Sequence, residues 1–303
     1  MNRTAAEEAP QFAFSSIDPE ARMGLPVGRN TNPAGFNSFL LGLILCGLLY
    51  LVTYVMVFVL GSASSSTDTN PSDTPKVWLY LTGFNKIPLG IAFLSCWSIA
   101  LLTLKSLKIR AQRKALTLRM LPDDPGFILV RGTLDRVLEH IDRSIIGTDR
   151  FVLVHRVLAG LKSARNTGRI AETDSVIESI ADSDESIMES GYTLVRGFIW
   201  AIPVLGFIGT ILGLMSAIGR FEGLLPKPGS DVDTASLVTN LGAVISGLEE
   251  AFVTTGEALV CALCIQLFLT FVRGSDERFL DDCRRYTSKY ILSRLRVDPD
   301  NGN

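Results

Sequence analysis

The chain has 303 residues, of which 47% are hydrophobic and 20% charged, and its formal net charge is −2. The mean hydropathy of +0.31 is above that of an ordinary water-soluble domain, and the apolar residues are concentrated in blocks. Five irregularly spaced cysteines argue against a disulfide framework, and two histidines, His140 and His155, argue against a histidine-based catalytic or metal site. We therefore expect a protein that is not an enzyme and that uses no metal or cofactor.

Four apolar stretches are long enough to cross a membrane as helices, which takes about 20 residues. A chain of this length could not enclose four such helices in water, so the sequence predicts an all-α, polytopic membrane protein. Two of the stretches contain residues that are unusual in a span, Pro203 in the third and Glu257 in the fourth. The predicted spans are Ser38–Leu60, Ile87–Leu104, Phe198–Ile218 and Ala251–Val272.

Lysine and arginine residues predict the orientation of these spans. Residues 1–37 carry three of them, residues 105–196 carry fifteen and residues 273–303 carry seven, whereas the two remaining loops carry few. By the positive-inside rule both termini and the long middle segment are cytoplasmic. The predicted parts are therefore an N-terminal tail (1–37), two spans with a short outer loop (38–104), a helical cytoplasmic domain (105–196), two further spans (197–272) and a C-terminal tail (273–303).

The cytoplasmic segment contains two turn signals, at Leu121–Gly126 and Asn166–Gly168, and two blocks of like charge. Six basic residues follow the second span, and seven acidic residues precede the third. One interpretation is that both blocks are solvated helix faces. The other is that they face each other across a stalk or a neighbouring subunit, where exposed ion pairs would set register and partner choice. The blocks are Lys105, Lys108, Arg110, Arg113, Lys114 and Arg119, and Glu172, Asp174, Glu178, Asp182, Asp184, Glu185 and Glu189.

The third and fourth predicted spans each carry a stripe of small residues with one threonine. At 100° per residue, one face of the third span holds Gly206, Thr210, Gly213 and Ala217, and one face of the fourth holds Ala251, Thr255, Ala258 and Ala262. Small residues are typical of close helix packing in lipid, and that role is expected here too. Packing alone leaves the matched threonines unexplained.

A second stripe on the fourth span consists of Glu250, Thr254, Glu257 and Cys261. A carboxylate inside a span is costly unless it faces protein or water, so it marks a functional position. Glu250 and Glu257 lie about 10.5 Å apart along the helix, and we expect a proton relay between them, with Thr254 in the middle. Two alternatives stay open: Glu250 sits at the outer interface, or Glu257 pairs with a basic residue at a subunit contact, such as Lys86.

The same two spans resemble a known family. The stretch LGFIGTILGLM at Leu205–Met215 resembles the pore-helix motif of the MotA/TolQ/ExbB proton-channel family, closer to its ExbB/TolQ branch than to MotA. The stretch GLEEAFVTTGEAL at Gly247–Leu259 resembles that family's last pore helix, in which a glutamate precedes a threonine by five residues. This chain departs from the pattern at Gly256 and Glu257, and its extra first span gives four helices, as in MotA.

The resemblance implies a pore lined by Thr210 and Thr255, with Glu250 in the place of the family's pore carboxylate. It further implies a homopentamer around a single-span partner of the ExbD/TolR/MotB kind, whose aspartate carries the ion. No aspartate lies within a predicted span of this chain, which fits that implication. Pro203 leaves the Ile199 carbonyl without its helical donor, so it is expected to act as a hinge. Gly206, Gly209 and Gly213 are expected to serve close packing.

The expected function is that of an ion-channel subunit in a motor driven by the proton-motive force, in the bacterial inner membrane. The alternatives are a non-conducting scaffold or receptor of the same fold, and a secondary transporter. No internal repeat of the kind common in transporters is present. The sequence leaves open whether the ion is a proton or sodium, and whether the work is protein transport, motility, envelope maintenance or defence.

Overall fold

The computed structural model of the chain is mostly helical. It describes residues 12–13, 17–24, 26–28, 31–64, 86–117, 129, 131–222 and 234–295. The chain divides into two compact units, one of residues 1–37, 102–193 and 270–303, and the other of residues 38–101 and 194–269. We call them the polar unit and the apolar unit.

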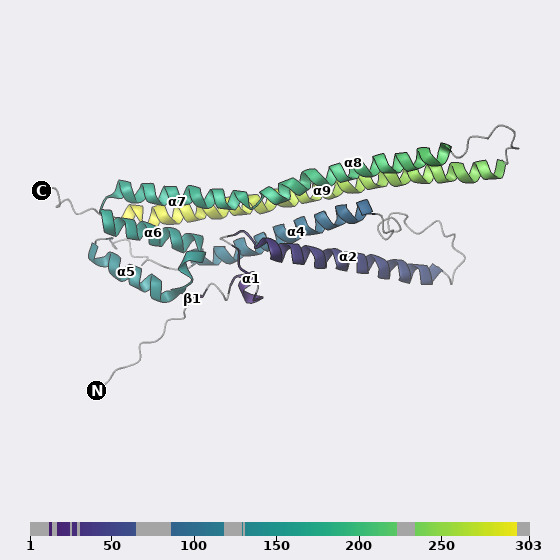
Figure 1. Cartoon of the computed structure of the whole chain (residues 1–303). Helices are drawn as coiled ribbons and strands as arrows, with labels where there is room; N and C mark the ends of the chain where they lie inside the picture. The colour runs from purple at the N-terminus through teal and green to yellow at the C-terminus, as the bar shows by residue number, and fades with distance from the viewer. Residues whose placement is uncertain are drawn as a thin grey trace. The chain divides into compact units, whose positions relative to one another are not determined.

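The secondary structure consists mainly of long helices (Figure 1). Four of them, α2, α4, α8 and α9, contribute residues to both units. The second expected turn is confirmed, since α6 ends at Gly168 in the left-handed conformation, with φ of 68°. The first, Leu121–Gly126, lies outside the described residues. The elements are β1 (Phe12–Ala13), α1 (Pro19–Arg22), α2 (Gly35–Ser64), α4 (Lys86–Arg113), η2 (Lys114–Thr117), α5 (Arg131–Ser144), β2 (Ile145–Ile146), η3 (Thr148–Arg150), α6 (Val152–Thr167), α7 (Ile170–Ser190), α8 (Thr193–Glu222), α9 (Thr234–Tyr290) and η4 (Leu292–Arg294).

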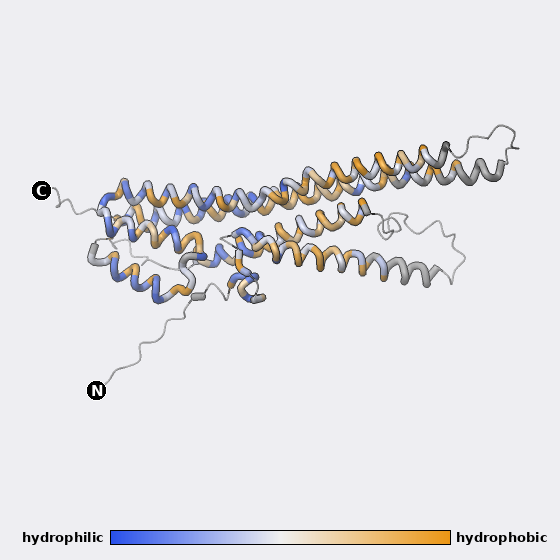
Figure 2. Tube along the Cα trace, viewed as in Figure 1, coloured by the Kyte–Doolittle hydropathy of each residue, from blue (hydrophilic) through white to orange (hydrophobic). Residues whose placement is uncertain are grey.

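Four helical stretches among the described residues are long and apolar enough to cross a membrane, and each overlaps one predicted span. Figure 2 shows them as orange runs along α2, α4, α8 and α9. Large apolar side chains stand exposed along them, such as Phe207 at 62%, Met215 at 63% and Phe252 at 67%. A water-soluble monomer rarely exposes so many large apolar side chains. The four stretches are Gly35–Val52, Ile87–Thr117, Ile170–Gly219 and Gly247–Arg294.

Aromatic residues and a glycine join the helices of the apolar unit. The Trp97 ring lies 5.0 Å from the Phe39 ring on α2 and 4.8 Å from the Phe198 ring on α8, measured between centroids. A Cβ placed on Gly42 would lie 2.7 Å from the Trp97 Cα, so only glycine fits there. This contact lets α2 approach the α4 backbone closely.

Helices α5, α6 and α7 form the core of the polar unit. The apolar face of α6, including Val157 and Leu161, is fully buried, and α7 packs against it through Ile177 and Ala181. A Cβ on Gly160 would lie 2.8 Å from the Ile177 Cδ1 atom, which sets how closely the two helices approach. Two short strands pair in parallel beside this core, with Phe12 opposite Ile145 and Ala13 opposite Ile146.

A buried glutamate organises the N-terminal segment of the polar unit. The carboxylate of Glu20 accepts hydrogen bonds from the backbone N–H of Gly28 and of Ala34, both at 2.9 Å, and from the Asn37 amide at 3.1 Å. It also forms a buried ion pair with Lys108 of α4. Burial alone would raise the pKa of Glu20, but these donors together lower it. Through Glu20, the backbone of Gly28 and Ala34 and the side chain of Asn37 are linked to Lys108 at the end of α4.

Candidate ion-pathway site

Helices α8 and α9 meet through the small residues that the sequence analysis singled out. A Cβ on Gly206 would lie 2.5 Å from the Ala258 Cβ, and one on Gly213 would lie 2.7 Å from the Ala251 Cβ. Real Cβ atoms do not approach so closely, so larger residues would push the two helices apart. The glycine and alanine stripes therefore form the α8–α9 contact, and α8 continues through Pro203 as one helix.

The two threonines of these stripes lie beside that contact. The Thr255 hydroxyl of α9 donates to the Gly206 carbonyl of α8 at 3.1 Å, so it bridges the helices. The Thr210 hydroxyl donates to the Phe207 carbonyl of its own helix at 2.6 Å. Since Gly206 precedes Thr210 by one helical turn, both hydroxyls lie along the same side of α8. Both threonine side chains are partly exposed, unlike the buried Ala251 and Ala258 on either side of Thr255.

The third threonine, Thr254, is buried against α8. Its hydroxyl donates to the Ala251 carbonyl at 2.9 Å, and a Cβ on Gly209 would lie 2.7 Å from that hydroxyl oxygen. The neighbouring helix therefore covers its side chain, and the expected relay through Thr254 between the two glutamates stays a prediction. Thr254 fills the α8–α9 contact beside Gly209.

Glu257 is half-buried in the apolar unit and lies close enough to Tyr50 of α2 to interact with it electrostatically. Tyr50 was not among the residues expected at this site, although a tyrosine within a predicted span is a signal in itself. The backbone of Glu250 belongs to α9 and that of Lys86 to α4, but both side chains lie outside the described residues. The relay between the two glutamates and the pairing with Lys86 both stay predictions.

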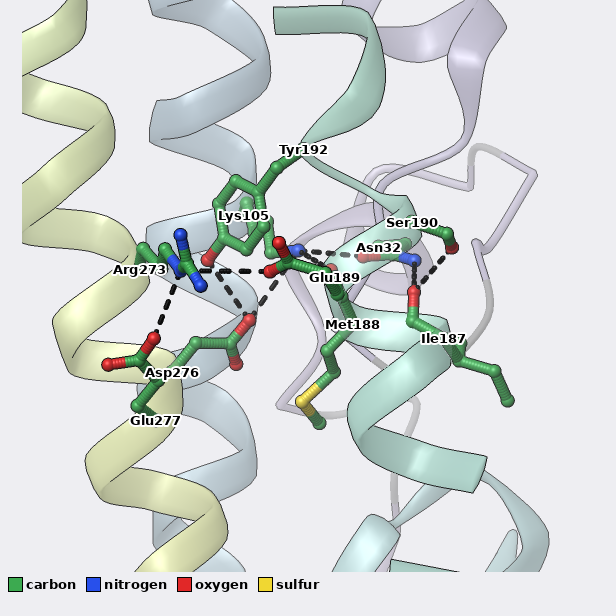
Figure 3. Close-up of polar contacts among 10 residues, drawn as sticks. All are labelled: Asn32, Lys105, Ile187, Met188, Glu189, Ser190, Tyr192, Arg273, Asp276 and Glu277. Atoms are coloured by element: carbon green, nitrogen blue, oxygen red, sulfur yellow. Dashed lines mark hydrogen bonds and ion pairs between the residues drawn. The ribbon is translucent and has the colours of Figure 1, made fainter. Parts of the chain in front are cut away.

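A buried polar cluster in the polar unit was not expected from the sequence (Figure 3). The Lys105 ammonium lies 3.5 Å from Asp276 Oδ2, donates to the Asn32 side chain at 2.9 Å and to the Met188 carbonyl at 2.7 Å, and sits 3.6 Å from the centre of the Tyr192 ring. The Tyr192 hydroxyl donates to the same Asp276 oxygen at 3.0 Å. The cluster joins α4, α7, α9 and the N-terminal segment through charge-assisted hydrogen bonds.

Burial governs the protonation of this cluster. It lowers the pKa of Lys105 to about 8, against the attraction of Asp276, which raises it. It also raises the pKa of Asp276, although Lys105 and the Tyr192 hydroxyl favour the charged carboxylate. The second carboxylate oxygen of Asp276, Oδ1, has no hydrogen-bond partner among the described residues. The Thr31 hydroxyl lowers the pKa of Asp276, although the two groups do not form a hydrogen bond. A buried lysine and a buried aspartate thus depend on each other for their charges.

The acidic block on α7 pairs with arginines of α6 and α9 rather than with the basic block. Arg284 of α9 reaches Asp182 at 3.5 Å and Glu185 at 3.0 Å, and Arg156 of α6 reaches Asp184 at 3.0 Å with its side chain fully buried. Within the described part of the chain, no ion pair joins the two blocks. The interpretation that the blocks face each other, across a stalk or a neighbouring subunit, stays a prediction; one attraction between the blocks, of Glu189 on Lys105, is observed.

These observations define a multi-pass, α-helical membrane protein with two closely packed spans that carry hydroxyl groups at their contact. Residues 152–284 match the sequence model of the MotA/TolQ/ExbB proton channel family. The matched stretch includes α6, α7, α8 and all of α9 up to Arg284, and so contains both resembling motifs. The family's sequence model covers the MotA, TolQ and ExbB branches together, so the chain's closer likeness to ExbB and TolQ stays a prediction. No curated protein and no solved structure matches the chain.

Proposed function

We propose that this chain is the channel subunit of a motor complex in the bacterial inner membrane, driven by the proton-motive force. The observation that carries the proposal is the α8–α9 contact, where the Thr255 hydroxyl reaches the Gly206 carbonyl and Thr210 lies one turn further along α8. Both threonines lie inside the stretch that matches a proton channel family. Hydroxyl groups at a contact of small residues can line a narrow polar path between apolar helices.

In this proposal five copies of the chain surround a single-span partner, and an aspartate of that partner carries the ion. The absence of aspartate from the four predicted spans supports a partner that supplies the carboxylate. One charge crossing 100 mV supplies about 2.3 kcal/mol, which is enough to drive one conformational step per ion. Thr210 and Thr255 would face the partner helix, and Glu250 and Glu257 would exchange protons beside them.

The membrane orientation in this proposal places both termini in the cytoplasm. The lysine and arginine distribution supports it, because 25 of the 29 basic residues lie in the three segments assigned to the cytoplasm. In this orientation the polar unit, with its buried Lys105–Asp276 pair, lies in the cytoplasm.

Co-expression with candidate single-span membrane proteins tests the assembly. We expect a complex of five copies of this chain with the partner, detected by mass measurement of the detergent-purified complex, and proton flux after reconstitution. A functional monomer that conducts without any partner would contradict the proposal. A stable ring that binds no partner and conducts no ions would instead favour the non-conducting scaffold.

A further inference from the structure

Three helices of the apolar unit bring polar side chains together around Glu257. Tyr50 of α2 lies close enough to Glu257 of α9 to interact with it electrostatically, and it is also close to Cys96 of α4. Cys46, one turn before Tyr50 on α2, interacts with the same Cys96 thiol. Both cysteines are buried, whereas Tyr50 and Glu257 are half-buried. Four polar groups therefore gather where α2, α4 and α9 come together.

Two further contacts bring the three helices together at this place. A Cβ on Gly42 of α2 would lie 2.7 Å from the Cα of Trp97, so the backbones of α2 and α4 approach closely beside the cluster. On α9, the Cys261 thiol follows Glu257 by one turn and lies within reach of the Ser95 hydroxyl of α4. The polar groups are thus held by helix packing on two sides.

Glu257 lies on a different side of α9 from the threonine contact. Around the helix it is about 160° from Thr255 and about 120° from Ala251, and both of these residues meet α8. Cys261 is only about 40° from Glu257. This side of α9 therefore faces α4 and α2 of the same chain. The Glu257 carboxyl has its own surroundings, distinct from those of the Thr255 hydroxyl.

Tyrosine is the best hydrogen-bonding group that these surroundings offer to a carboxyl. Residues 38–60, 87–101, 197–219 and 250–269 contain no lysine, arginine or histidine. A thiol is only a weak donor and a weak acceptor, whereas a tyrosine hydroxyl does both well. It can accept a hydrogen bond from the protonated carboxyl and donate one to the ionised form. The titratable residues of these segments are Cys46, Tyr50, Tyr54, Cys96, Glu250, Glu257, Cys261 and Cys264.

We infer that Tyr50 is the hydrogen-bond partner of Glu257 and that the two side chains form a proton-binding site between α2 and α9. The site lies within one chain and needs no residue from a neighbouring copy. Because the hydroxyl can bond both forms of the carboxyl, it holds Glu257 in place while a proton arrives and leaves. Tyr50 is then a positioning residue. Its part in proton exchange rests on the proposed function, whereas the contact itself does not.

Infrared spectroscopy of the purified protein tests the contact without a partner and without ion flux. The band of the protonated Glu257 carboxyl is identified by its loss in Glu257→Gln. Tyr50→Phe removes only the hydroxyl and should move this band to higher frequency, because the carboxyl loses a hydrogen bond. Tyr54→Phe is the matched control, since Tyr54 lies one turn further along α2 and is 67% exposed. A band that Tyr50→Phe leaves unmoved, or no Glu257 band at any pH, would overturn the inference.

Proton flux of the reconstituted complex tests the role in exchange. Tyr50→Phe should move the pH midpoint of flux by about half to one pH unit, the size expected for one hydrogen bond, and Tyr54→Phe should not. In a Glu257→Gln chain, Tyr50→Phe should have no further effect. An unmoved midpoint, or independent effects of the two changes, would overturn the role of Tyr50 and leave the proposed function standing. A complex that conducts no protons, although its Glu257 band responds to Tyr50→Phe, would overturn the proposed function and leave the contact.

Discussion

Lys105 of α4 and Asp276 of α9 form a buried ion pair, with Nζ 3.5 Å from Oδ2 and each side chain at most 3% exposed. Removing one partner of such a pair leaves an uncompensated charge, at a cost of about 3–5 kcal/mol. We therefore expect Asp276→Asn to destabilise the purified protein strongly in thermal unfolding. Glu277→Gln, which changes the exposed neighbour on α9, is the matched control and should cost about 0–1 kcal/mol.

The stability lost in the Asp276→Asn variant should depend on pH. The attraction of Asp276 raises the pKa of Lys105, so Asp276→Asn should lower it further below about 8. A lysine whose pKa is lower in the folded state destabilises the fold most at low pH, and this destabilisation declines as pH rises above that lowered pKa. The stability difference from the natural protein should accordingly shrink as pH rises from 6 to 9. A difference that is constant over this range would show that Lys105 keeps its charge without Asp276.

Gly213 at the α8–α9 contact offers a test of close packing. Its added Cβ would meet the Ala251 Cβ at 2.7 Å, so Gly213→Ala should cost about 1–3 kcal/mol and weaken assembly. Gly219, in the same helix, has no atom within 4 Å of its added Cβ, and Gly219→Ala should be neutral or slightly stabilising. Equal thermal stability of the two variants would contradict the observed contact.

The membrane orientation can be measured with introduced cysteines. Because the basic residues predict cytoplasmic termini, Ser64→Cys and Ser230→Cys should react with a membrane-impermeant thiol reagent added from outside. Ser163→Cys on α6 should react only after the cells are opened. The reverse pattern would require both termini to lie outside.

Periodicity and composition predicted the membrane helices and the glycine contact, because both follow from local sequence. The same rules grouped Thr254 with the glutamates but did not predict that Gly209 of α8 lets the helices approach until Thr254 is covered. Lys105 was assigned to a basic block, yet its counter-charge comes from Asp276, 171 residues away. Glu20 similarly binds Lys108 of α4. No local pattern encodes such contacts, since they depend on which helix ends the fold brings together.

Glu257→Gln tests whether this carboxyl takes part in proton transfer. A glutamine keeps the size of the side chain but cannot exchange a proton, so a relay predicts lost or pH-shifted flux with the complex intact. A structural ion pair instead predicts poor assembly, which size-exclusion chromatography would detect. Normal flux and normal assembly together would show that Glu257 has no essential role.

The threonine hydroxyls are the centre of the proposed pathway, and proton flux in reconstituted vesicles tests them most directly. Thr210→Val and Thr255→Val keep the shape of each side chain and remove its hydroxyl, while Thr→Ser at the same positions keeps the hydroxyl and serves as the control. With the partner present and assembly intact, we expect each valine variant to reduce flux by about ten-fold or more, roughly 1.4 kcal/mol in the barrier, and each serine variant to conserve it. Unchanged flux in both valine variants would contradict the proposed pathway.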